Sequence, residues 1–165
     1  MMIEISLRRA SSLGGPNLDL SSHPDQKLLH ANCVSIEGTG VLILGSAGSG
    51  KSSLSLKLIG LGARLVSDDQ TYITRDMRKL VATCPDTIKG KIEARGIGIL
   101  SLSPLDSTVL SLVVDLNLQN DERLPKDDTY EILGITLRRI GRSRLDAFAE
   151  AVYLLARNMK TDVKG

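Results

Sequence analysis

The chain has 165 residues, of which 42% are hydrophobic and 24% charged, and this length and composition fit one globular domain and exclude wholesale disorder. Its formal net charge of +2, with three Tyr, one Phe and no Trp, argues against nucleic-acid binding, because basic patches and aromatic platforms are both scarce. The longest aliphatic runs fall far short of the ~20 residues of a membrane span, and the first residues lack the apolar core of a signal peptide. We therefore expect a cytoplasmic protein that binds neither nucleic acid nor membrane.

The first part of the chain is predicted to contain a loop followed by a strand pair. Residues 1–26 are assigned to an N-terminal strand and a flexible leader, because Gly, Pro, Ser and Asp dominate residues 10–26. Strands are predicted at 33–36 and 41–44, joined by a turn at 37–40. Further strands are predicted at 63–67, 71–74, 80–83, 109–116 and 131–138.

Two helices are predicted. The first runs from Lys51 to Leu61; its periodicity also suits a strand, but the Gly-rich segment before it favours a helix. The second covers 143–159, where apolar residues recur with helical spacing from Leu145 to Met159, and Ser143 with Asp146 forms a candidate capping box. We interpret this apolar stripe as core.

The two cysteines, Cys33 and Cys84, form no CxxC pair, so we expect free thiols and no structural metal.

Residues 45–52 read Gly-Ser-Ala-Gly-Ser-Gly-Lys-Ser and fit the phosphate-binding pattern GxxxxGK[ST] between a predicted strand and a predicted helix. In such a loop the glycines allow backbone N–H groups to surround a phosphate, the lysine reaches the β- and γ-phosphates, and the final hydroxyl ligates Mg²⁺. The pattern predicts an α/β P-loop kinase domain with a mixed, mostly buried sheet, a P-loop helix and a C-terminal helix. The residues predicted to bind ATP are Gly45, Ser46, Ala47, Gly48, Ser49, Gly50, Lys51, Ser52 and Ser53.

A P-loop needs a carboxylate near the γ-phosphate, and the chain offers two candidates. Asp68 and Asp69 follow the strand predicted after the P-loop helix. If that strand is parallel to the P-loop strand, its carboxyl end lies at the same sheet edge as the loop, where one acid can organise Mg²⁺ and the other accept a proton. Asp115 ends an apolar run and is the Walker-B-like alternative. Spacing favours the Asp pair only modestly.

Five segments together resemble bacterial HPr kinase/phosphorylase. Residues 29–30, 45–52 and 65–69 match in order, and residues 92–99, Ile-Glu-Ala-Arg-Gly-Ile-Gly-Ile, resemble the family signature. Residues 139–142, Arg-Ile-Gly-Arg, resemble the run that precedes the family's final helix. The resemblance covers about 27–159 and implies a short form whose catalytic domain spans 27–165.

The resemblance implies an ATP- and Mg²⁺-dependent kinase that phosphorylates a serine of the phosphocarrier protein HPr, within the sugar/nitrogen phosphotransferase system. It also implies a phosphorylase that removes the group with inorganic phosphate and releases pyrophosphate, and a homo-oligomer, which in the family is a hexamer. By carry-over, the catalytic residues are His30, Lys51, Asp68, Asp69, Arg139 and Arg142. The metal ligands would be Ser52, Asp69 and Glu93, and the partner-binding residues Arg95, Gly96, Ile97 and Gly98.

Two other hypotheses remain open at this point. The first is a small-molecule kinase or NTPase that shares the P-loop, and the second is a nucleotide-binding regulatory module without turnover. The signature at 92–99 argues against the first, because a generic small-molecule kinase has no need of it. The presence of Lys51 beside candidate acids argues against the second.

Overall fold

The computed structural model describes residues 25–162. The predicted N-terminal strand and most of the predicted leader lie outside this range. The described strands are β1 (Gln26–Leu29), β2 (Ala31–Ile36), β3 (Thr39–Leu44), β4 (Arg64–Ser67), β5 (Thr71–Asp76), β6 (Lys79–Thr83), β7 (Lys91–Ala94), β8 (Gly98–Ser101), β9 (Ser107–Gln119), β10 (Asp128–Ile132) and β11 (Ile135–Arg142). The helices are α2 (Lys51–Gly60) and α3 (Phe148–Asp162), with a 3-10 turn, η1 (Asp86–Ile88).

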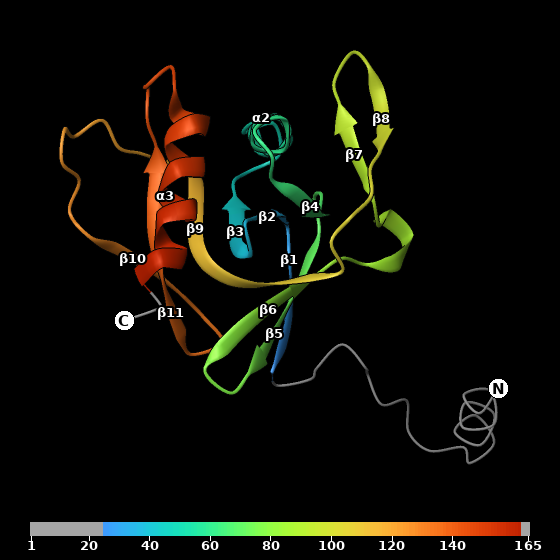
Figure 1. The fold of residues 1–165 in the computed structure, drawn as a ribbon, viewed down its shortest axis with the longest axis horizontal. Coiled ribbons are helices and arrows are strands. Elements are labelled where there is room, and N and C mark those ends of the chain that lie inside the picture. Colours follow the sequence, from blue (N-terminus) through green and yellow to red (C-terminus); the bar gives the residue numbers. More distant parts are fainter. Residues whose placement is uncertain (1–24, 163–165) are drawn as a thin grey trace.

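A mixed nine-stranded sheet forms the body of the molecule, in the order β1-β5-β6-β9-β3-β2-β4, and the β10–β11 hairpin pairs with β9. The long strand β9 joins two layers, because its first residues pair with β6 and its later residues pair with β3 and β11. In Figure 1, β9 curves from the lower layer containing β5 and β6 into the upper layer beside β3. Strands β7 and β8 form a separate hairpin.

The core lies on both faces of the upper layer, because successive side chains of its strands point to opposite faces and are buried on both. On β3, Val41 and Ile43 face one cluster, which includes residues of α2 and α3. Leu42 between them faces the other cluster, which includes residues of β5 and β6. This burial on both faces explains the near-continuous apolar run that the sequence shows at 41–44. Figure 1 shows α3 over the strand layer and α2 viewed along its axis.

Most predicted strands are confirmed, but the single strand predicted at 131–138 is wrong. The structure has the β10–β11 hairpin there, with a turn at Leu133 and Gly134, whose φ angles are 50° and 76°. Two successive left-handed residues are typical of the two-residue turns that join antiparallel strands. The strands β7 and β8 and the strand β1, which begins inside the predicted leader, were not predicted.

The C-terminal helix is confirmed, but its start and its capping box are wrong. Helix α3 begins at Phe148, and the Ser143 hydroxyl accepts a hydrogen bond from the Leu145 N–H instead of capping the helix. Leu145, predicted as core, is 54% exposed, whereas Ala149, Val152 and Ala156 are buried as predicted. The local turn at Ser143 satisfies a backbone donor and so competes with helix formation.

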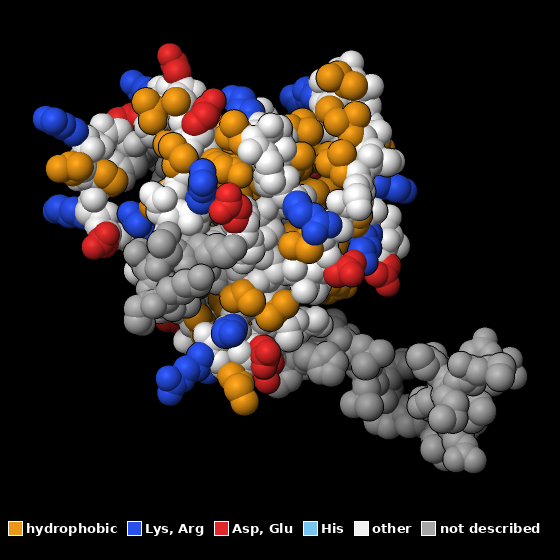
Figure 2. Space-filling view, viewed as in Figure 1, with side chains coloured by type: hydrophobic (Ala, Val, Ile, Leu, Met, Phe, Trp, Pro, Cys, Tyr) orange, Lys and Arg blue, Asp and Glu red, His pale blue; other side chains and the backbone are white. Residues whose placement is uncertain are grey.

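Three surface and redox features complete the fold. Within residues 25–162, no helix is both long and apolar enough to cross a membrane. Cys33 and Cys84 are free, as predicted, and burial raises the pKa of both thiols. On the face shown in Figure 2, Lys and Arg side chains alternate with Asp and Glu, and hydrophobic side chains gather over the β7–β8 hairpin.

Candidate functional site

One edge of the upper layer gathers the predicted site. Strands β11, β9 and β3 are parallel, while β2 is antiparallel to both β3 and β4, so β4 runs in the same direction as β3. The carboxyl ends of these four strands therefore lie at one edge, which is where α/β folds bind ligands. The P-loop leaves this edge after β3, Asp68 and Asp69 leave it after β4, and the antiparallel β2 begins there with Ala31.

The P-loop has the backbone that its glycines allow. Gly48 and Gly50 have φ angles of 76° and 99°, in the left-handed region that favours glycine. Gly50 is the N-cap of α2, so the positive end of the helix dipole opens towards the loop. The loop is also held from outside: the Asn117 Oδ1 accepts hydrogen bonds from the Ser46 N–H at 3.1 Å and the Ser46 hydroxyl at 3.2 Å.

Lys51 is the first residue of α2, and its side chain is buried against the P-loop. Its Nζ donates to the Gly45 carbonyl at 2.9 Å and to the Ser46 carbonyl at 3.3 Å, and lies 3.2 Å from the His30 Nε2. These partners satisfy the ammonium group, as a buried cation requires. The charge is thereby placed inside the loop, where a polyphosphate would lie.

Asp68 is joined to the P-loop by short hydrogen bonds. The Ser52 hydroxyl donates to the Asp68 Oδ1 at 2.7 Å, and the Asn32 Nδ2 donates to the same oxygen at 2.7 Å. The Glu93 N–H donates to the other carboxylate oxygen at 3.2 Å, which ties the β7–β8 hairpin to the site. The prediction that the Asp pair lies at the P-loop edge of the sheet is therefore consistent with the strand directions and with direct contact.

Asp69 is next to Asp68 but faces a different partner. It is 63% exposed, and its Oδ1 lies 3.3 Å from the His30 Nδ1. Its φ angle of 67° is unusual for a residue with a side chain, and the Asn32 Oδ1 accepts its N–H at 2.8 Å. The buried Asn32 amide thus holds Asp68 through its nitrogen and the Asp69 backbone through its oxygen.

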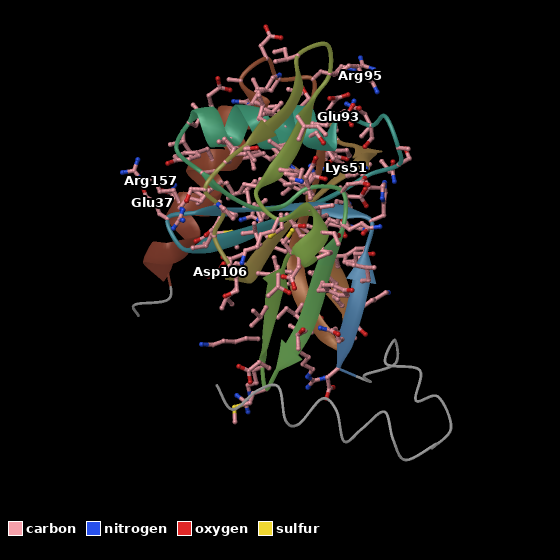
Figure 3. All side chains as sticks on the ribbon, turned by 90° about the vertical axis from the view of Figure 1, so that its right-hand side faces the viewer. Glu37, Lys51, Glu93, Arg95, Asp106 and Arg157 are labelled. Carbon is pink, nitrogen blue, oxygen red and sulfur yellow. The ribbon has the colours of Figure 1, made fainter. Side chains whose placement is uncertain are left out.

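A pocket of about 510 Å³ lies in front of these groups. Its walls come from the P-loop and α2, from β2 and β4 ends, and from the β7–β8 hairpin. The predicted site residues that line it are His30, Ala47, Gly48, Gly50, Lys51, Ser52, Ser53, Asp69, Glu93, Arg95 and Ile97. Figure 3 shows Lys51, Glu93 and Arg95 on one side of the molecule, with Glu37 and Arg157 at the opposite end of α2.

The remaining predicted residues do not line this pocket. Arg139 donates from Nε to the Asp128 Oδ2 at 2.8 Å and stacks over the Tyr130 ring, with 5.7 Å from its Cζ to the ring centroid. Arg142 donates to the Ser49 carbonyl of the P-loop. Gly96 and Gly98 lie at the tip of the β7–β8 hairpin. The functional roles assigned to these residues stay predictions.

The residues present fit a magnesium ion bound together with phosphate. Within the described range, no group of three or more His, Cys, Asp and Glu side chains is arranged to hold a metal. Mg²⁺ usually binds through one or two carboxylates, with waters and substrate phosphates completing an octahedron. The Ser52 hydroxyl and the Asp68 carboxylate, 2.7 Å apart, are hard oxygen donors of that kind.

Sequence reasoning missed two polar residues of the site. Asn32 is fully buried, and it contacts Ser52 and Ser55 as well as the Asp pair. A polar residue inside the buried strand β2 was the available signal, because a buried amide needs partners. Asn117 follows Asp115 by two residues, but its contact with the P-loop depends on the parallel pairing of β9 with β3.

Three comparisons relate this chain to known proteins. Residues 22–141 match the family model described as HPr Serine kinase C-terminal domain. The chain is 38% identical over 128 residues to an HPr kinase/phosphorylase of Limosilactobacillus reuteri, covering 70% of this chain and 40% of that protein. It is 39% identical over 125 residues to an HPr kinase/phosphorylase of Caldanaerobacter subterraneus, covering 70% and 41%.

A solved structure supports the fold. The HPr(Ser) kinase/phosphatase from Coxiella burnetii matches with a TM-score of 0.71 and 29% identity, covering 84% of this chain and 99% of that one. The chain spans about 40% of the length of the curated relatives named above.

Proposed function

We propose that this chain, which belongs to the HPr Serine kinase C-terminal domain family, is an ATP-dependent kinase that phosphorylates a serine of an HPr-type phosphocarrier protein. Two contacts carry the proposal: the Ser52–Asp68 contact of 2.7 Å supports a pair that would bind a metal at the P-loop, and the Asp69–His30 contact of 3.3 Å supports a candidate base beside it. That combination is what phosphoryl transfer to a hydroxyl requires.

The phosphates of ATP would lie on the P-loop. Lys51 and the N-terminal N–H groups of α2 would balance the negative charge of the β- and γ-phosphates. Ser52 and Asp68 would hold Mg²⁺, which, when bound, neutralises phosphate charge. Glu93 lines the same pocket and would act on the metal's bound waters. The contacts support Asp68, rather than the Asp69 predicted from the sequence, as the carboxylate nearer the metal.

Asp69 would act as the general base. Its exposed carboxylate lines the pocket, so a seryl hydroxyl that enters can reach it. The carboxylate takes the hydroxyl proton while the seryl oxygen bonds to the γ-phosphorus. The bond to the β–γ bridging oxygen breaks and its electron pair leaves with ADP. His30, between Asp69 and Lys51, orients the base.

The β7–β8 hairpin is the proposed docking element for the protein substrate. Ile97 and Ile99 are 80% and 70% exposed at its end, and Arg95 lines the pocket below. Exposed apolar side chains beside a catalytic pocket are typical of a protein-binding surface. Arg95 would contact phosphate or an acidic group of the partner. The homo-oligomer implied by the resemblance stays a prediction.

The test is phosphorylation of HPr. The purified chain is incubated with Mg-ATP and HPr from the same source, and phosphate is located by mass spectrometry. We expect one phosphoserine on HPr, and none with the Lys51→Ala variant. ATP hydrolysis without phosphorylated HPr would contradict the proposal and favour an NTPase. Phosphorylation of a metabolite pool but not HPr would favour a small-molecule kinase.

The reverse reaction has its own test. We propose that inorganic phosphate removes the phosphoryl group from phosphoserine-HPr and that pyrophosphate is the product. The chain would be given phosphoserine-HPr with Mg²⁺ and phosphate, and pyrophosphate would be measured enzymatically. Orthophosphate release without pyrophosphate, or no release at all, would contradict this part of the proposal.

A further inference from the structure

A second cavity of about 380 Å³ lies beside the P-loop, away from Asp69 and Glu93. Its walls come from the P-loop, the first two turns of α2, β9, and the segment that leads from β11 into α3. The lining residues are Ser49, Gly50, Ser53, Leu54, Lys57, Leu116, Arg142, Ser143, Leu145, Asp146, Phe148 and Ala149. Its volume is within the range of about 300–1,000 Å³ typical of small-molecule sites.

The two cavities meet at the start of α2. Gly50 and Ser53 are the residues common to both linings, so the helix N-terminus separates one cavity from the other. A polyphosphate bound at this N-terminus has two ends. The end near Asp69 and Glu93 lies among the groups that suit phosphoryl transfer, so the other end points to the second cavity.

The chemistry of the second cavity differs from that of the first. Leu116, Leu145 and Phe148 provide apolar walls, and Phe148 is the only Phe of the chain. Asp146 and Ser143 add hydrogen-bonding groups, and Lys57 and Arg142 add positive charge near the P-loop. An apolar cleft with a few convergent polar groups suits an aromatic base attached to a sugar.

We propose that this second cavity binds the nucleoside of the nucleoside triphosphate whose phosphates lie on the P-loop. The base packs against Leu145 and Phe148, and the Asp146 carboxylate accepts hydrogen bonds from sugar hydroxyls or a base amino group. Leu145 supports this assignment, because it belongs to neither core cluster and remains 54% exposed at the cavity. The inference rests on the proposed function, since it assumes that the P-loop binds a triphosphate.

The experiment compares two ligands by isothermal titration calorimetry with the full chain: Mg-ATP and inorganic triphosphate with Mg²⁺. If the second cavity binds the nucleoside, the unmutated protein should bind ATP more tightly than it binds triphosphate. Leu145→Ser should weaken ATP binding about five- to tenfold, through loss of apolar contact area, and leave triphosphate binding unchanged. Leucine and serine are both uncharged, so the substitution does not change the electrostatic environment of the phosphates.

Leu154→Ser is the matched control, because Leu154 is also 54% exposed on the same C-terminal segment but does not line the cavity. It should change neither affinity. Phe148→Leu is a second variant that keeps much of the volume but removes the ring, and it should weaken ATP binding several-fold. Thermal midpoints by circular dichroism confirm that each variant is folded.

Each outcome separates this inference from the proposed function. Equal binding of ATP and triphosphate by the parent, or equal ATP binding by Leu145→Ser and Leu154→Ser, would overturn the nucleoside cavity while HPr phosphorylation remained. A parent that bound neither ligand would overturn the proposed function as well as the nucleoside cavity.

Discussion

Two acidic regions lie at the same edge of the sheet, and they differ in what surrounds the carboxylates. Asp115 is on β9, directly beside the P-loop strand and paired with Leu44. Asp68 and Asp69 follow β4, which is separated from β3 by β2. Strand adjacency alone would select Asp115 as the P-loop's acidic partner.

The contacts select the other region. Asp115 is 9% exposed, accepts the Asn117 N–H at 3.0 Å, and lies 3.8 Å from the Arg139 guanidinium, which compensates its charge. Asp68 instead accepts a direct hydrogen bond from the P-loop hydroxyl of Ser52, and Asn32 on the intervening strand donates to the same carboxylate oxygen. A shared sheet edge therefore does not by itself bring a carboxylate into contact with the P-loop: Asp115 lies near a cation, and Asp68 contacts the loop hydroxyl.

The largest effect is expected from Lys51→Ala, which removes the cation buried against the P-loop. We expect loss of detectable ATP binding by calorimetry and a fall in HPr phosphorylation of at least about 10³-fold. The fold should persist. Unchanged turnover would end the assignment of this loop to phosphate binding.

Asp69→Asn and Asp115→Asn compare the two acidic regions directly. We expect Asp69→Asn to lower kcat by about 10²–10⁴-fold, the usual size of a lost acid–base contribution, with ATP affinity largely kept. Asp115→Asn should lower kcat less than about threefold, because Asp115 contacts Asn117 and Arg139 and does not line the pocket. Single-turnover phosphorylation of HPr measures both. The reverse ranking would mean that the catalytic acid belongs to β9.

Asn32→Val tests the residue that joins Asp68 to the P-loop. The side chain is similar in size but leaves the Asp69 N–H without its acceptor, and the Asp68 Oδ1 keeps only the Ser52 hydroxyl as a donor. We expect the Mg²⁺ concentration that gives half-maximal kcat to rise about 10–100-fold, as for other groups that orient metal ligands. We also expect the free energy of unfolding to fall by about 1–3 kcal/mol. Asn32→Asp would keep an acceptor for the Asp69 N–H, so it should retain more stability but bring a second carboxylate against Asp68. A mutant with parental Mg²⁺ titration would show that Asn32 acts on folding alone.

Arg142 and Arg139 should differ although they lie three residues apart on β11. Arg142→Gln removes a donor to the Ser49 carbonyl of the P-loop, and we expect ATP affinity to fall up to about tenfold. Arg139→Gln should change ATP affinity less than about twofold, since the contacts of Arg139 are with Asp115, Asp128 and Tyr130. Equal losses for the two variants would place Arg139 in the site, as the resemblance implies.

The smallest effect concerns the Asp128–Arg139 pair and depends on pH. The hydrogen bond from Arg139 lowers the pKa of Asp128, so the carboxylate is favoured in the folded state. Its stabilisation is present above the carboxyl's unfolded pKa and is lost as pH falls through the lower, folded value. Asp128→Asn should lower the thermal midpoint slightly at pH 7, and this difference should vanish at strongly acidic pH. A pH-independent difference would assign the effect to packing.

Particular residues show how far sequence reasoning reached in the fold. The helix over 51–61 and the buried strand at 41–44 were predicted because glycine spacing and local hydrophobicity determine them. The β10–β11 hairpin was read as one strand because the turn at Leu133 and Gly134 lacks the common Asn-Gly or Asp-Gly pair. The start of α3 was misplaced because the Ser143 side chain forms a local turn, and the same spacing also fits a capping box.

The sequence by itself determined the phosphate-binding loop, the strand and helix on either side of it, and the family. These depend on residues close together in the chain, where backbone conformation and local hydrogen bonding limit the choices. Only the tertiary structure decided which acids contact the loop, that Asn32 joins them, and that Leu145 borders a second cavity. Strand order, direction and register bring those groups together, and they depend on contacts between distant segments, which no local pattern specifies.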